Sequence, residues 1–164
     1  MTELLGKLSS YNIFNYLFPG AVFSILAQQL SLFDVPDDII QQVVWYYFIG
    51  MVMSRMGSIL VEPILRKMKF ITYSKYSDYL IASELDQKIE TMVEVSNTYR
   101  TLATVFLALL VSSLFHGLLA KSGLDAELQK KVVIALLLAL FILSFRKQVA
   151  YISYRVEHSS KGNK

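Results

Sequence analysis

Five polar or charged side chains lie within or beside long apolar stretches, and their chemistry must be explained first: Asn12, Asn15, Arg55, Glu62 and Arg100. Arg55 lies near the middle of the apolar residues 43–66, and Glu62 follows seven residues later. A charge at membrane depth costs roughly 2.5–3.5 kcal/mol on insertion scales, so it needs a partner, a wet cavity or a function. Seven residues of helix span about 10 Å, so Arg55 reaches Glu62 of its own helix poorly.

Each of these side chains has candidate partners elsewhere. Glu62 ends one apolar stretch and Arg100 begins another, so the two could meet across adjacent helices. For Arg55 we expect Glu62 of a neighbouring subunit, or Asn15, as the partner. Asn12 and Asn15 share a helix face and either bond to a neighbouring helix or line a polar path. For Arg55 and Glu62, structural packing and a role in a polar pore or in sensing are both open.

Catalytic and metal-binding patterns are missing from the sequence. There is no GxSxG, P-loop or HExxH motif, and no cysteine for a disulfide or a zinc–thiolate site. The two histidines, His116 and His158, lie far apart, and we expect His116 to be a solvated residue near a helix end rather than a proton relay. We therefore expect no enzyme activity, no cofactor and no metal.

Composition indicates a membrane protein of one domain. Of 164 residues, 54% are hydrophobic and 18% are charged, against about 25% charged in typical soluble domains. The apolar residues form runs, which predict an all-α integral membrane four-helix bundle over residues 1–157, with helices extending into the cytoplasm. The expected spans are residues 11–33, 43–66, 102–119 and 130–147. At Pro19, either an interfacial helix turns into the membrane or the first span is kinked.

The segments between the spans have their own signals. Pro36 followed by Asp37 and Asp38 predicts a helix start. In the connection 67–101, residues 70–80 suggest a loop or strand-like stretch, and a helix from Ser83 is expected to run straight into the third span. The charges on that helix form a solvated face or an interaction surface. The last helix should extend past the membrane, and residues 158–164 are expected to be a disordered tail.

The basic residues are distributed unevenly, which predicts the topology. Four spans place 12 Lys and Arg residues on the side of the termini and three on the other side, with Arg55 inside the membrane. The positive-inside rule then puts both termini and the 66–100 segment in the cytoplasm. The bilayer, rather than nucleic acid, accounts for the basic character.

Small residues recur at four-residue spacing in the second span, at Gly50, Ser54 and Ser58. This small-xxx-small pattern lets helix backbones approach closely. A lone bundle of this size encloses no channel, so any path for ions would lie between protomers. We therefore expect a homo-oligomer with these three residues at helix contacts.

Three segments carry a resemblance: YNIFNYLFPG near the start, SRMGSILVEPILRKMKFI at the end of the second span, and EVSNTYRT entering the third. Together they resemble a group of small bacterial inner-membrane proteins, over most of residues 11–105. The resemblance implies an association with anti-phage defence loci, where such proteins are commonly membrane-disrupting effectors. No chemistry is attached to these motifs.

Two functions from different classes fit these features. The first is an oligomeric inner-membrane effector or pore-forming component, controlled through its cytoplasmic region. The second is a non-conducting membrane anchor or scaffold that recruits a soluble cytoplasmic protein through the same region.

Overall fold

The computed structural model describes residues 13–121 and 126–162, and within these ranges all regular structure is helical. The expected all-α class is therefore confirmed, whereas the count of four membrane spans stays a prediction. In chain order, with η marking a π-helical turn, the elements are η1 (Ile13–Leu17), α2 (Phe18–Gln29), α3 (Ile39–Met56), η2 (Gly57–Val61), α4 (Glu62–Lys67), α5 (Tyr76–Leu85), α6 (Lys88–Lys121) and α7 (Ala126–Gly162).

The second apolar stretch forms one long helical path, α3 through η2 to α4. It begins at Asp38, whose side-chain Oδ1 accepts hydrogen bonds from the backbone N–H groups of Ile40 and Gln41 at 3.0 Å each. These bonds satisfy two N–H groups that a helix start otherwise leaves unpaired. The helix start predicted from residues 36–38 is therefore confirmed.

Each π-turn is followed, one residue later, by a proline. Pro19 is the second residue of α2 after η1, and Pro63 is the second residue of α4 after η2. A proline has no N–H to donate to the preceding turn, and the extra residue of a π-turn lets the helix continue past it. The helix continues from η1 into α2 through Pro19, and the choice between the two alternatives there stays a prediction.

Two glycines allow the first helix to lie directly against α3. A Cβ atom on Gly20 would overlap the backbone carbonyl oxygen of Tyr46, and a Cβ atom on Gly50 would overlap that of Tyr16. Backbone therefore touches backbone at this contact, which is the close approach that small residues permit. A small apolar core of Phe23, Ala27, Met53, Val105 and Leu109 joins α2, α3 and α6.

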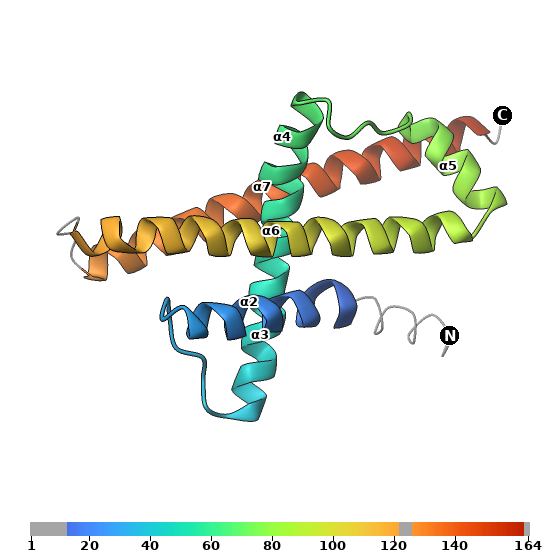
Figure 1. Cartoon of the computed structure of the whole chain (residues 1–164). Helices are drawn as coiled ribbons and strands as arrows, with labels where there is room; N and C mark the ends of the chain where they lie inside the picture. Colours follow the sequence, from blue (N-terminus) through green and yellow to red (C-terminus); the bar gives the residue numbers. More distant parts are fainter. Residues whose placement is uncertain (1–12, 122–125, 163–164) are drawn as a thin grey trace.

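The long helix α3–η2–α4 crosses α6 and α7 instead of running beside them (Figure 1). This differs from the side-by-side bundle that we expected. The crossing with α6 is tight because position 57 is glycine: a Cβ there would lie 2.7 Å from Thr104 Oγ1. Helices that meet at one such point of small residues are free to diverge on either side of it.

The connection before α6 also differs from expectation. A helix begins at Tyr76, within the stretch expected to be a loop, and it ends at Leu85 rather than continuing from Ser83. The break is set by Asp86, whose carboxylate accepts from the N–H of Lys88 at 2.9 Å and so starts a new helix. From there α6 runs without interruption through residues 102–119, as predicted.

The last helix, α7, contains the predicted fourth span and extends well beyond it. It reaches Gly162, so residues 158–162 are helical rather than part of a disordered tail. Once a helix is nucleated, each added residue gains a backbone hydrogen bond, which explains how the helix can extend through a polar segment.

Within the described residues, two helices are long and apolar enough to cross a membrane, Ile39–Lys67 and Leu128–Glu157. They correspond to the second and fourth predicted spans. The first predicted span does not meet this length, because its helix α2 has 12 residues. The third lies inside α6, where side chains are described only up to residue 114.

Candidate functional site

A buried carboxylate lies where α4 meets α6 and α7. The side chain of Glu62 is 7% exposed, and its Oε2 accepts a hydrogen bond from Arg100 Nη1 at 2.8 Å. The same oxygen lies 3.6 Å from Lys147 Nζ. The structure thus forms the Glu62–Arg100 pair expected from the sequence and adds a second cation from α7.

Lys147 is anchored by more than this ion pair. Its Nζ donates to both the backbone carbonyl oxygen and the Oγ of Ser58, at 2.8 Å each. That carbonyl lacks a backbone partner because the Glu62 N–H bonds to the carbonyl of Gly57 instead, and Pro63 has no N–H. The π-turn therefore creates the acceptor through which α7 binds η2.

The sequence analysis did not identify Lys147 as a candidate site residue. It entered only as the last residue of the predicted fourth span. A usable signal existed, because Glu62, Arg100 and Lys147 all stand at span ends predicted to share one side. We refer to these three residues together with Ser58 as the Glu62 cluster.

Positive charge exceeds negative charge in and around this cluster. Two cations share one carboxylate, and the Nε of Arg100 is buried without a hydrogen-bond partner in the described structure. Arg66, one turn after Glu62, lies with its Cζ 5.5 Å from the ring centre of Tyr73. Burial raises the pKa of Tyr73, the Glu62 carboxylate adds to the rise, and Arg100 and Arg66 oppose it. The pKa of Tyr73 is therefore affected by all three charges.

Arg55 lies apart from this cluster. Its Nη2 donates to the hydroxyl oxygen of Tyr16 at 3.1 Å, and Tyr16 in turn packs edge-on against Tyr47 at 5.5 Å between ring centres. Within the chain, the expectation of Asn15 as partner is wrong by one residue, because successive residues of η1 point in different directions around the helix. A partner from a neighbouring subunit is not tested by a single chain.

Asn15 instead faces α6. It is buried, and its Oδ1 lies 3.5 Å from Thr101 Oγ1, whose single hydrogen is shared with the nearer carbonyl oxygen of Asn97 at 2.8 Å. This contact between η1 and α6 favours helix–helix bonding over a polar path for Asn15. Asn12 lies outside the described residues.

The small-residue stripe is used inside the chain. Gly50 lies against the backbone of Tyr16, Ser54 is buried, and Ser58 binds Lys147. All three residues thus lie at helix contacts within one protomer. The homo-oligomer stays a prediction, and these residues do not supply its interface in this arrangement.

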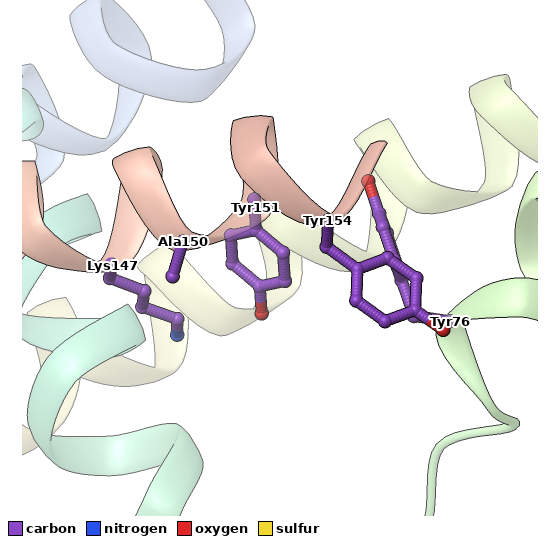
Figure 2. A pocket seen from close by; sticks show the side chains of 5 residues that line it. All are labelled: Tyr76, Lys147, Ala150, Tyr151 and Tyr154. Atoms are coloured by element: carbon purple, nitrogen blue, oxygen red, sulfur yellow. The ribbon is translucent and has the colours of Figure 1, made fainter. Parts of the chain in front are cut away.

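A cavity of about 240 Å³ lies beside the cluster, between α5 and α7. Its lining comprises Tyr76, Lys147, Ala150, Tyr151 and Tyr154. Ring centres lie 5.5 Å apart for Tyr76 and Tyr151, and 5.1 Å apart for Tyr76 and Tyr154. Figure 2 shows the Lys147 and Tyr151 side chains extending to the same side of α7. We call this the tyrosine pocket.

Among the described residues, no group of three His, Asp or Glu side chains could hold a metal ion. The side chains of His116 and His158 lie outside the described part of the chain. Comparison with known proteins adds no assignment, since no family model, curated protein or solved structure matches the chain.

Proposed function

We propose that this chain is a multi-span protein of the bacterial inner membrane that acts as an oligomeric effector or pore-forming component. The observation that carries the membrane assignment is the exposure of α7. In the most apolar window of the helix Leu128–Glu157, only 6% of the residues are buried. A core helix of a soluble protein would be largely covered, because exposed apolar surface costs about 25 cal/mol per Å². The acyl chains of a bilayer would surround this exposed apolar surface, and a helix of this length is long enough to cross the hydrocarbon core.

The Glu62 cluster supports a topology with both termini in the cytoplasm. It joins the end of the second predicted span, the start of the third and the end of the fourth, which share one side in that topology. In Figure 1 the start of η1, the α4–α5 connection and the end of α7 lie to the right of the long helix α3–α4, whereas the α2–α3 turn and the end of α6 lie to its left. The excess of basic residues belongs to the first group of ends.

Arg55 supports the effector over an inert membrane protein. It stands two turns before Glu62, away from the cluster, and it donates to the neutral hydroxyl of Tyr16. A guanidinium at that depth has a strong need for an anion or water, which another protomer or a polar path would supply. The resemblance of three segments to small defence-associated membrane proteins is the basis for proposing a role in anti-phage defence.

The scaffold is the second candidate, and a separate observation favours it. Large apolar side chains of the predicted cytoplasmic part are exposed: Leu85 by 84%, Met92 by 69% and Tyr99 by 68%. They lie on α5 and α6, beyond the predicted membrane boundary. A soluble protein that packs on them would bury apolar surface that is otherwise in water.

The membrane assignment is tested by extraction and reporter fusions. We expect the full-length protein to stay with the membrane pellet after alkaline carbonate washing. A reporter that works only in the cytoplasm should be active when fused after Lys164, and an exported reporter should be active when inserted after Pro36. Release into the supernatant, or the opposite pattern of reporter activity, contradicts the assignment.

The two functions are separated by membrane potential. Cells that express the wild-type protein are compared with cells that express Arg55→Ala and, as a matched control, Arg146→Ala, using a potential-sensitive dye. An effector should depolarise the cells in the wild type and in Arg146→Ala, and much less in Arg55→Ala. Unchanged potential in the presence of a co-expressed defence locus, together with capture of a soluble protein through α5, favours the scaffold.

A further inference from the structure

One side of α7 packs on the protein, and the other side is exposed. On the packed side, Lys147 bonds to Ser58 of η2. Tyr151 packs against Tyr76 of α5. Figure 2 shows Lys147, Ala150 and Tyr151 extending to the same side of the helix. The packed side is therefore fixed by polar and aromatic contacts near the end of the predicted fourth span.

The exposed side carries a regular stripe of large apolar side chains. They are Leu138 (62% exposed), Ile142 (58%), Phe145 (71%), Val149 (43%), Ile152 (54%) and Val156 (63%). Successive members are separated by four, three, four, three and four residues. Apolar residues that alternate in this way pack two helices side by side in a left-handed coiled coil. We call these six residues the α7 stripe.

Lipid can cover only part of the α7 stripe. Its first three members lie within the apolar part of the predicted span, whereas its last three follow the basic residues that mark the exit. In a helix along the bilayer normal, Val156 lies about 16 Å past Phe145. One head-group layer is roughly 5–8 Å thick, so acyl chains do not reach Val156. The cytoplasmic end of the stripe therefore needs a protein partner to leave water.

We propose that the α7 stripe pairs with the α7 stripe of a second copy in a parallel coiled coil. This inference rests on the proposed membrane location and names the interface of the proposed oligomer. The spacing is unbroken from Leu138 to Val156, so one helix that covers the whole stripe must itself cross the membrane. The α7 helix of another copy meets this requirement. Copies inserted with the same topology have parallel α7 helices, so a two-fold axis along the bilayer normal brings equal positions together.

Area and charge are compatible with this pair. Each stripe side chain exposes roughly 100 Å², so two stripes bury up to about 1,200 Å², the lower limit of stable interfaces. Positions that flank the stripe meet across a parallel pair. In the cytoplasmic part these are Gln148 and Ser153, which are uncharged and do not repel each other. Ile152 is turned about 140° from Lys147 around the helix, so Lys147 keeps its bond to Ser58.

The test is disulfide crosslinking of single-cysteine variants in isolated membranes. The chain has no cysteine, so each introduced thiol reports one position. Membranes that contain the full-length protein are oxidised with copper–phenanthroline, and the fraction of covalent dimer is measured. Ile142→Cys and Ile152→Cys, on the stripe, should give mostly dimer. The matched controls are Leu143→Cys and Ala150→Cys, which are exposed elsewhere on α7 and should give at least about fivefold less dimer.

A second measurement follows self-association by energy transfer between labelled copies in lipid vesicles. Ile152→Glu places two carboxylates opposite each other and removes apolar contact, so it should weaken dimerisation at least about tenfold. Ala150→Glu adds the same charge on the packed side and should weaken it by less than about twofold. Because Ile152 is exposed in one copy, its substitution should leave the helix content of that copy unchanged.

Several results would overturn the proposal. Equal crosslinking at stripe and control positions would show random collision, and a lack of dimer at all four positions would exclude the pair. A covalent adduct of Ile152→Cys with a different protein would assign the stripe to another partner. The proposed function fails separately: release by carbonate would refute the membrane assignment. Unchanged membrane potential with intact crosslinking at Ile152→Cys would refute the effector and leave the interface standing.

Discussion

Replacing Glu62 with glutamine removes the carboxylate that Arg100 and Lys147 share, while it keeps the shape of the side chain. The Glu62 side chain is 7% exposed, and those of Arg100 and Lys147 are 21% and 28% exposed. Breaking a buried ion pair from one side typically costs about 3–5 kcal/mol, because a charge is left without its partner. Both cations keep some access to water, so we expect the lower end, a loss of about 3 kcal/mol.

The loss is measured by thermal unfolding of the purified protein in detergent. For a chain of this size, 1 kcal/mol corresponds to roughly 2–4 °C, so the melting temperature should fall by about 6–12 °C. Glu94→Gln, which removes a carboxylate from an exposed position on α6, serves as the control. Surface substitutions of this kind usually change stability by less than about 0.5 kcal/mol.

A double-mutant cycle tests whether the pair itself is responsible. Arg100→Met is made in the wild type and in the Glu62→Gln background. If the two side chains interact, Arg100→Met should cost about 1.5–3 kcal/mol less stability in the Glu62→Gln background than in the wild type. Wild-type stability of Glu62→Gln, or strictly additive losses in the cycle, would refute the reasoning.

The remaining predictions use the same unfolding assay. Gly50→Ala should destabilise by about 3 kcal/mol, because the added Cβ overlaps the backbone of Tyr16. Tyr16→Phe should lower stability by about 1–2 kcal/mol, because the Arg55 guanidinium loses its acceptor. Lys69→Gly should raise stability by about 0.5–1 kcal/mol, because residue 69 has a left-handed φ of 57° that a side chain disfavours. Asp38→Ala should cost about 1 kcal/mol through loss of the helix cap.

Neighbouring positions provide controls for two of these changes. Lys67→Gly lies within the helix α4, so it should destabilise by about 1 kcal/mol where Lys69→Gly stabilises. Asp37→Ala removes a carboxylate that makes no cap bond in the described structure, and it should change little. If Lys67→Gly and Lys69→Gly shift stability in the same direction, the explanation from φ is wrong.

The helical class and much of the helix placement were predictable from the sequence. Long apolar runs, the Asp38 cap and the continuity of α6 follow from local rules that act within a few residues. The pairing of Glu62 with Arg100 was also predictable, because both stand at span ends on the same predicted side. The break at Asp86 was missed because its carboxylate was interpreted as part of a polar face rather than as a cap.

Contacts between distant segments were harder to predict. The choice of Tyr16 over Asn15 as the partner of Arg55 depends on the direction of one residue in a π-turn, which periodicity does not give. The place of Lys147 depends on a carbonyl that only the hydrogen-bond pattern reveals. The crossing of α3–α4 over α6 and α7 depends on point contacts such as Gly57 with Thr104, which carry no periodic signal.

The π-turn before Pro63 has a consequence for how this sequence can vary. One of the two acceptors of Lys147 is a main-chain oxygen, so Ser58→Ala removes the hydroxyl but leaves the other bond in place. The acceptor exists because position 63 is an imino acid. The determinant of this interhelical bond therefore lies five residues from the atom that makes it. Related chains could lose Ser58 and keep the junction, whereas another residue at position 63 could restore a helical bond to the carbonyl oxygen and weaken its bond with Lys147.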